Sequence, residues 1–205
     1  MLEVIDISCR KGGKALFTHL SFQVMPGQCW VIEGGNGSGK TSLLRIVANL
    51  SQPETGTLQW KGQAIAEVEP DYRHHILYGG HSAGVSGQLS VQENLNFLLS
   101  MDGVASEQSV YMGALKRCGL FSLRHQQVQK LSAGQKKRCF LVRLALSQRP
   151  LWVLDEQLTA LDQAGQDLLG ELVAQQLAAG GAVVMTSHQP VSWPVALRSV
   201  HLGAA

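Results

Sequence analysis

Residues 28–50 read QCWVIEGGNGSGKTSLLRIVANL, and this stretch decides the fold. It begins with a short apolar run typical of a buried strand, and from Thr41 onward its apolar residues recur at helical spacing. Between the two lies GGNGSGKT, residues 34–41, which fits the pattern G-x-x-x-x-G-K-[ST]. The sequence therefore predicts a strand, a glycine-rich phosphate-binding loop and a helix in direct succession.

The chemistry of phosphate binding explains each residue type in this loop. Glycines let the backbone turn its N–H groups toward a phosphate, and the helix start adds its positive end. Lys40 would supply a mobile charge for the β- and γ-phosphates, and the Thr41 hydroxyl is a hard oxygen ligand for Mg²⁺. A glycine-rich turn without a ligand is the alternative. The residues expected to contact ATP are Gly34, Gly35, Asn36, Gly37, Ser38, Gly39, Lys40, Thr41 and Ser42.

Length and composition exclude several classes of protein. The chain has 205 residues, which suits one domain or one domain with a small lobe. A net charge of +2 excludes a polybasic nucleic-acid binder. Charged residues make up only 16%, so we expect a partner to cover part of the surface. The first residues, MLEVIDISCRKGGK, carry charges where a secretory signal needs an apolar stretch, which predicts a cytoplasmic chain.

The four cysteines show neither a zinc-site spacing nor a disulfide framework. The sequence contains no C-x-x-C pair and no Cys/His cluster at ligand spacing. We therefore expect the cysteines to be buried and to act as small apolar residues. They are Cys9, Cys29, Cys118 and Cys139.

Strand-like and helix-like runs alternate along the chain. Four short strand patterns near the start of the chain, LEVIDISC, LSFQV, QCWVIEG and GTLQWKG, favour a small, partly antiparallel β subdomain. Residues 90–128 are mainly helical in pattern, and the glycine-rich segment before them is loop-like. The apolar strands RPLWVLDE and AVVMTSH alternate with helix-like segments, which predicts a parallel sheet covered on both faces, with AVVMTSH as its final buried strand.

Two carboxylates follow the apolar run Trp152–Leu154. In a parallel sheet the carboxyl ends of the strands face the ligand crevice. Asp155 would reach Mg²⁺ through water, and Glu156 would polarise the water that attacks the phosphate. The alternative is that these acids cap the helix that follows. His188 ends a further apolar strand at the same edge, where it would contact the γ-phosphate or the attacking water; a surface histidine is the alternative.

A helix start at residues 131–135, LSAGQ, carries the remaining motif. Ser132 reads as an ordinary N-cap in the simplest interpretation. However, Lys136, Lys137 and Arg138 follow at once, and cations near a helix N-terminus oppose its macrodipole. A helix start that receives an anion explains this arrangement better.

Together these segments resemble the ABC-transporter ATPase family. The phosphate loop GGNGSGKTS, the signature LSAGQKKR, the segment LWVLDE, the D-loop LTALD with Asp162 and the switch histidine His188 occur in family order. The resemblance implies an α/β P-loop NTPase fold with a RecA-like parallel-sheet core, a small antiparallel β subdomain and a helical subdomain. We expect a single ABC ATPase domain over residues 1–205, with a core lobe of about 1–89 and 135–205 and a helical subdomain of about 90–134.

The resemblance also implies a site and a mechanism. ATP and Mg²⁺ would be sandwiched in a head-to-tail homodimer, between the phosphate loop of one chain and the signature of the other. The signature contacts would be Ser132, Ala133, Gly134 and Gln135. The metal would be held by Thr41 and Asp155, with Ser82 as a further candidate. The catalytic residues would be Glu156, His188 and Lys40.

Within the family, several details are similar to the ATP-binding subunits of cytochrome c maturation systems. They are the short length, the form IEGGNGSGKTSLLR, Gly80-His81, LSAGQKKR, PLWVLDE and TSHQ. This resemblance implies a CcmB-like membrane permease and a haem-handling membrane subunit as partners, and no nucleic acid. The chain would be a peripheral subunit on the cytoplasmic face of the inner membrane, where ATP hydrolysis drives haem export or the release of a haem-loaded chaperone.

Three positions depart from the family pattern. The stretch Cys9–Gly12 lacks the aromatic residue that stacks on adenine, and Arg10 is the candidate to replace it. Ser82 stands where the family has a glutamine. Gln157 stands where a proline usually follows the catalytic glutamate, and we expect its flexibility to loosen that loop.

Three other functions are alternatives, and the second of them does not fit the sequence. A nucleotide-dependent assembly module with weak hydrolysis is suggested by the altered Ser82 position. A soluble ABC ATPase that acts on DNA or ribosomes usually needs a long insertion or a second ATPase unit, and neither is present in the sequence. The ATP-binding subunit of another ABC transporter, such as a small-molecule importer, is the third.

Overall fold

The computed structural model describes residues 1–82, 84–187, 191 and 193–203. Contacts among them define two compact units. The sheet unit comprises Met1–Tyr78, Arg149–Glu156 and Val173–Ala205, and the helical unit comprises Gly79–Gln148 and Gln157–Leu172. The predicted lobe boundaries at 90 and 134 stay a prediction.

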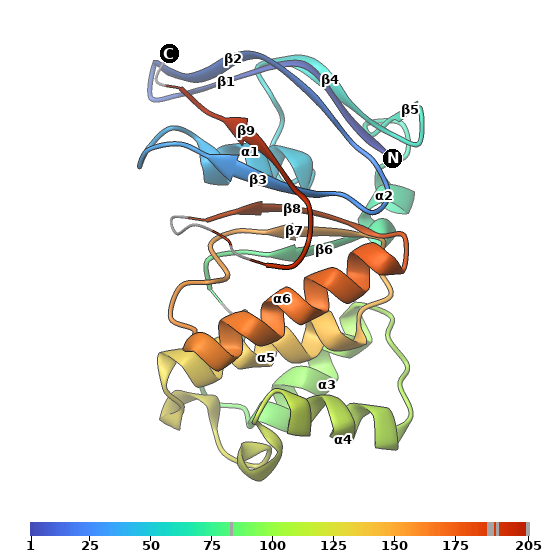
Figure 1. Ribbon diagram of the computed structural model, residues 1–205, viewed down its shortest axis with the longest axis vertical. Helices are drawn as coiled ribbons and strands as arrows, with labels where there is room; N and C mark the ends of the chain where they lie inside the picture. The colour runs from blue at the N-terminus through green and yellow to red at the C-terminus, as the bar shows by residue number, and fades with distance from the viewer. Residues whose placement is uncertain (83, 188–190, 192, 204–205) are drawn as a thin grey trace. The chain divides into compact units, whose positions relative to one another are not determined.

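A five-stranded sheet carries the phosphate loop (Figure 1). Its strand order is β6-β7-β8-β3-β9, and β3 pairs in parallel with both β8 and β9. Ile32 lies opposite Thr186 and Leu154 lies opposite Met185, so the carboxyl ends of β3, β7 and β8 meet at one edge. The strands are β3 (Cys29–Glu33), β6 (Ile76–Gly79), β7 (Leu151–Leu154), β8 (Ala182–Thr186) and β9 (Leu197–His201).

A second sheet, of four strands in the order β2-β1-β4-β5, is antiparallel. Helix α1 packs against β1 of this sheet and against β7 and β8 of the parallel sheet. The buried side chains of α1, among them Leu43, Leu44 and Val47, therefore join both sheets in one hydrophobic core. The elements are β1 (Leu2–Lys11), β2 (Lys14–Val24), α1 (Lys40–Val47), β4 (Thr55–Trp60), β5 (Gln63–Ala64) and α2 (Glu69–His75).

The helical unit is built around α5 (Ala133–Leu146), which packs against α3 (Val91–Met101) and α4 (Gln108–Arg117). Arg143 of α5 forms a two-point ion pair with Asp102, at 2.8 and 3.0 Å, where α3 ends. Both side chains are largely buried, so this pair fixes α3 on α5. The unit also contains the short helices η1 (Phe121–Leu123) and η2 (Val128–Lys130) and the first part of α6 (Gln163–Ala178).

The predicted parallel sheet and small antiparallel sheet are confirmed, but β3, which the sequence groups with the antiparallel strands, belongs to the parallel sheet, and one exposed strand follows the predicted final buried strand. Residues 182–186 form β8, and β9 follows it as the edge strand beside β3. The side chains of β9, LRSVH, are mostly exposed. Its sequence has no continuous apolar run and therefore does not show the pattern of a buried strand. The sequence patterns described above also do not predict helix α2 or strand β6.

Burial of the cysteines is confirmed for three of the four. Cys29, Cys118 and Cys139 are buried, whereas Cys9 is half-buried. Burial raises the pKa of the Cys29 thiol to about 12, so the thiol stays protonated and packs as an apolar group.

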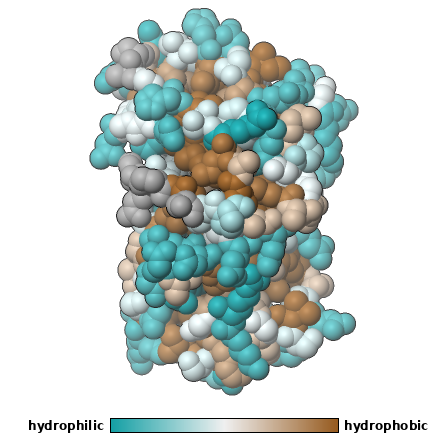
Figure 2. All heavy atoms as spheres, viewed as in Figure 1, coloured by the Kyte–Doolittle hydropathy of each residue, from teal (hydrophilic) through white to brown (hydrophobic). Residues whose placement is uncertain are grey.

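Apolar side chains are exposed on both units. Figure 2 shows apolar residues on one face of the sheet unit, over β3 and β9. In the same unit the ring of Trp30 packs against that of Phe22. In the helical unit Phe97 is 60% exposed and Met101 is 68% exposed, both on α3. No helix in the part of the chain that the structure describes is long and apolar enough to cross a bilayer.

Candidate functional site

The phosphate loop connects β3 to α1 through backbone that only glycine accepts. Gly34 has φ +143°, and a Cβ there would lie 2.6 Å from Ser38 Oγ and 2.7 Å from the carbonyl oxygen of Leu202. Gly39 caps α1 with φ 99° and no side-chain hydrogen bond. The N-terminus of α1 therefore keeps its N–H groups clear of side chains, as anion binding requires.

Lys40 is folded over this loop. Its side chain is buried, and Nζ donates to the carbonyl oxygens of Gly34 at 2.8 Å and Gly35 at 3.0 Å. These carbonyls hold a positive charge above the loop, where the sequence places the β- and γ-phosphates. The ammonium can exchange the carbonyls for phosphate oxygens by rotating its flexible side chain.

Oxygen ligands converge at the ends of β7 and β8. Asp155 is 2% exposed, and its Oδ1 accepts hydrogen bonds from Thr41 Oγ1 at 3.3 Å and from Thr186 Oγ1 at 2.8 Å. A carboxylate beside a hydroxyl at the end of the phosphate loop is the hard-oxygen set that Mg²⁺ prefers. The residues present therefore fit the predicted metal.

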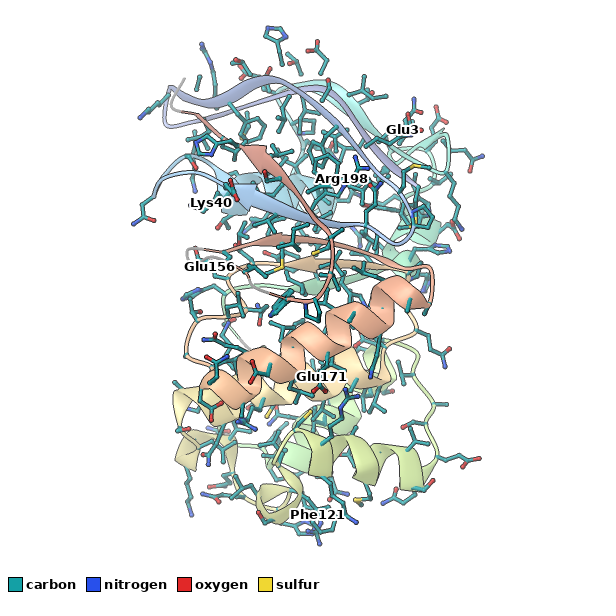
Figure 3. All side chains as sticks on the ribbon, viewed as in Figure 1. Glu3, Lys40, Phe121, Glu156, Glu171 and Arg198 are labelled. Carbon is teal, nitrogen blue, oxygen red and sulfur yellow. The ribbon has the colours of Figure 1, made fainter. Side chains whose placement is uncertain are left out.

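Glu156 leaves β7 in an unusual backbone conformation. Its φ is +53°, in the left-handed region, and its N–H donates to Thr186 Oγ1 at 3.0 Å. Non-glycine residues hold this conformation only when their surroundings enforce it. Lys40 and Glu156 lie at the same edge of the five-stranded sheet (Figure 3), and both line a cavity of about 220 Å³ together with Asn36, Gly37 and Thr41.

Thr186 is a site residue that sequence reasoning missed. Its side chain is fully buried, donates to the Asp155 carboxylate and accepts from the Glu156 backbone. One hydroxyl thus fixes both members of the acid pair. A polar residue that closes the apolar run AVVM was the available signal.

The wall of the cavity next to β1 and β2 comes from Lys11 and Leu16. Leu16 packs against Gly39: a Cβ added to Gly39 would lie 2.9 Å from the Cβ of Leu16. Arg10, the residue predicted to stack on adenine, lies instead with its Nε 3.8 Å from Glu54 Oε2. The stacking role of Arg10 stays a prediction.

The signature segment forms a capping box at the start of α5. Ser132 Oγ accepts from the N–H of Gln135 at 3.2 Å, and Gln135 Oε1 accepts from the N–H of Ser132 at 2.9 Å. The ordinary N-cap, the simplest interpretation of this sequence, is thus present. Ala133 is exposed at this helix start, and Gly134 is half-buried beside it.

Asp162 of the D-loop pairs with the signature helix. Its two carboxylate oxygens accept from Arg138 Nη2 at 2.7 and 3.0 Å, and its Oδ1 also accepts from the N–H of Gly165. The hydrogen bond from Arg138, more than any other contact, lowers the pKa of Asp162. The D-loop is therefore tied to α5 by a charge-assisted bond.

Gln157 contradicts the expectation of a loosened loop. The side chain is 2% exposed, and Nε2 donates to the carbonyl oxygens of Gly79 at 3.1 Å and Gly80 at 2.6 Å. The absence of proline does give the backbone more freedom at this position. A buried amide that binds two carbonyls restricts the loop more directly.

Two further residues, Ser82 and His188, are predicted to belong to the site. Ser82 is exposed in the helical unit, where it lines a cavity of about 560 Å³ together with His81, Lys136 and Thr159. Its role as a metal ligand stays a prediction. His188 lies outside the described residues, two positions after Thr186.

Comparisons with known proteins agree on one family. The family model described as "ABC transporter" matches residues 17–159. The cytochrome c biogenesis ATP-binding export protein CcmA of Pseudomonas aeruginosa is 40% identical over 204 residues, and the match covers 100% of both chains. The protein of the same name from Mannheimia succiniciproducens is 42% identical over 190 residues, which covers 93% of this chain and 88% of that one.

Solved structures confirm the predicted fold. A putative ABC transporter ATP-binding protein from Pyrococcus furiosus superposes with a TM-score of 0.84 at 24% identity, covering 98% of this chain and 96% of that one. A dimeric ATP-binding cassette in a post-hydrolysis state, bound to ADP and Pi, superposes with a TM-score of 0.77 at 22% identity, covering 92% and 88%.

Proposed function

The chain belongs to the ABC transporter family and, within it, to the CcmA proteins of cytochrome c biogenesis, and from this premise we propose that it is the ATP-hydrolysing subunit of a cytochrome c biogenesis transporter. The observation that carries the chemistry is the convergence of Lys40, Thr41 and Glu156 on one cavity. A cation, a hydroxyl and a carboxylate around a phosphate-sized space are the groups that phosphoryl transfer to water needs.

Binding begins at the phosphate loop. The triphosphate accepts hydrogen bonds from the backbone N–H groups of residues 35–41. Lys40 Nζ moves from the carbonyl oxygens of Gly34 and Gly35 to the β- and γ-phosphates. Because α1 points its N-terminus at the same place, its dipole adds to the charge of Lys40. These residues position the phosphates and stabilise the charge that develops in the transition state.

Thr41 and Asp155 are the residues that would hold Mg²⁺, Thr41 directly and Asp155 through water. The metal would neutralise charge on the phosphate oxygens. Thr186 keeps Asp155 in place through its 2.8 Å hydrogen bond, so the metal site depends on β8 as well as β7. Ser82 is the third candidate ligand, carried over from the family resemblance.

Glu156 acts as the general base on the attacking water. Glu156 lines the cavity of the phosphate loop, and its backbone N–H is bound by Thr186. A carboxylate that accepts a proton from water within hydrogen-bond reach accelerates the attack on the γ-phosphate. His188, just after β8, would contact the γ-phosphate or the same water.

A second copy of the chain completes the site. In a head-to-tail homodimer, the signature residues 132–135 of one copy would cover the γ-phosphate held by the other. Asp162 would lie close to the dimer interface. ATP binding would close this dimer, and hydrolysis would open it. The closing and opening would drive a CcmB-like permease and a haem-handling membrane subunit, with the chain bound peripherally at the cytoplasmic face of the inner membrane. The cargo would be haem or a haem-loaded chaperone.

The test is a pair of carboxylate-to-amide substitutions. Glu156→Gln removes the base but keeps the shape, so ATP binding and dimerisation should persist while turnover falls roughly 100- to 10,000-fold. Glu171→Gln is the matched control, because Glu171 is an exposed acid paired with Arg117 in the helical unit. This variant should hydrolyse ATP at the wild-type rate. Lys40→Ala should weaken nucleotide binding instead.

The same assay separates the proposed function from its alternatives. The tagged chain is isolated with the membrane complex it assembles into, and Mg²⁺-dependent phosphate release is measured together with the bound proteins. A complex that binds ATP without releasing phosphate would make this chain an assembly module. A permease for another substrate class would keep the ATPase chemistry and reject the role in cytochrome c biogenesis.

A further inference from the structure

Three successive carbonyl groups in the helical unit are bound by two buried side chains. Gln157 Nε2 donates to the carbonyl oxygens of Gly79 at 3.1 Å and Gly80 at 2.6 Å, and Lys137 Nζ donates to that of His81 at 2.8 Å. Lys137 Nζ also reaches Gln157 Oε1 at 3.4 Å. The two side chains therefore hold the loop and each other.

The side chains of Gln157 and Lys137 are both buried, so their hydrogen bonds are costly to break. Gln157 is 2% exposed and Lys137 is 8% exposed, so each lost hydrogen bond would leave a polar group without water. The loop also sits directly on α5, because a Cβ on Gly79 would lie 2.3 Å from Phe140 Cζ. The backbone of residues 79–81 is thus fixed from both the α5 side and the side of Gln157.

Gln157 directly follows Glu156, whose φ of +53° needs support from its neighbours. Thr186 supplies that support to the Glu156 N–H. On the C-terminal side the next residue is the buried Gln157, whose side chain is bound by three hydrogen bonds. The chain on that side of Glu156 is therefore restrained by its own side-chain contacts.

We propose that Gln157 and Lys137 are positioning residues for ATP hydrolysis, which together fix the chain after Glu156 and so hold the left-handed backbone that presents its carboxylate. This inference rests on the proposed function of Glu156 as the general base. It assigns to Gln157 the opposite of a loosening effect.

The test compares two buried glutamines. Gln157→Leu keeps the size of the side chain but removes its hydrogen bonds, and kcat for ATP should fall roughly 10- to 100-fold because the base is misplaced. KM should change little, since the phosphate loop is intact. Gln176→Leu is the matched control: Gln176 is 9% exposed and donates to the carbonyl oxygen of Arg149 at 2.9 Å in the sheet unit, so its loss should lower the melting temperature without lowering kcat.

Two further variants separate positioning from folding. Lys137→Met should reproduce the loss of kcat, and the double variant with Gln157→Leu should be no slower than the worse single variant, because the two residues act as one unit. Gln157→Asn keeps the amide and should recover part of the rate. Amide exchange across residues 79–82 should speed up in Gln157→Leu and stay unchanged in Gln176→Leu.

The outcomes distinguish this proposal from the function on which it rests. A wild-type complex that releases no phosphate would overturn the general-base assignment and this inference together. An active wild type whose Gln157→Leu variant keeps the kcat of Gln176→Leu would overturn this inference alone. Strictly additive losses in the double variant would also overturn it, because they would mean two independent contributions.

Discussion

Helices α3 and α5 begin with the same local structure but not with the same charge. In α3 the Glu93 N–H donates to Ser90 Oγ at 3.2 Å, and the Ser90 N–H donates to Glu93 Oε2 at 2.7 Å. In α5 Ser132 and Gln135 make the equivalent pair at 3.2 and 2.9 Å. Both helices thus satisfy their first N–H groups with a capping box.

The charge differs in the direction that a ligand site requires. Glu93 brings a carboxylate to the positive end of α3, and the Ser90 backbone N–H lowers the pKa of that carboxyl. The first turn of α5 has no acid, and Lys136 and Lys137 follow Gln135 directly. A helix start built for stability takes an acid, so α5 gives up that stabilisation at the place where the ATP phosphates of a second copy would lie.

The largest expected effect comes from making α5 resemble α3. Gln135→Glu keeps the capping box and adds the missing negative charge, so stability should hold or rise by a few tenths of a kcal/mol. The new carboxylate would face the γ-phosphate, and turnover should fall on the order of 100-fold. Steady-state ATPase and urea unfolding of the same preparations measure both effects. Wild-type turnover in Gln135→Glu would mean that α5 begins with an ordinary cap.

An intermediate effect should come from removing each serine in turn. Ser90→Ala and Ser132→Ala each lose a cap and should each cost about 1 kcal/mol of unfolding free energy. Only Ser132→Ala should also lose turnover, by roughly tenfold, since we propose that its hydroxyl also contacts ATP. Equal ATPase rates in the two variants would break the distinction between the helices.

The contrast between these helices could be read from the sequence because capping boxes and charges are local. The phosphate loop, the acid pair and LSAGQ were likewise predicted from short patterns with a fixed geometry. Strand β9 could not be predicted in this way. It pairs with β3 through backbone hydrogen bonds at the edge of the sheet, and its side chains are mostly exposed, so they form no apolar pattern. Pattern alone does not encode such a pairing.

Gln157 and Thr186 show a second limit of sequence reasoning. Their roles depend on partners far away in the chain: Gln157 binds the carbonyls of Gly79 and Gly80, and Thr186 binds Asp155. A departure from a family motif indicated Gln157, but the sign of its effect needed the three-dimensional contacts. Motifs locate the reacting groups, and the structure reveals what holds them.

The smallest expected effect is a pH dependence that only α3 should show. The pKa of Glu93 is lowered in the folded state from its ordinary value of 4.5, so its contribution to stability is present above that value and is lost as pH falls through the folded pKa. Glu93→Gln should therefore unfold at lower urea than the wild type at pH 7, and the two midpoints should meet at acidic pH. Gln135 does not titrate, so Gln135→Ala should lower the midpoint by the same amount at both pH values. If the gap between wild type and Glu93→Gln stayed constant with pH, the charge of Glu93 would contribute nothing and the two capping boxes would be equivalent.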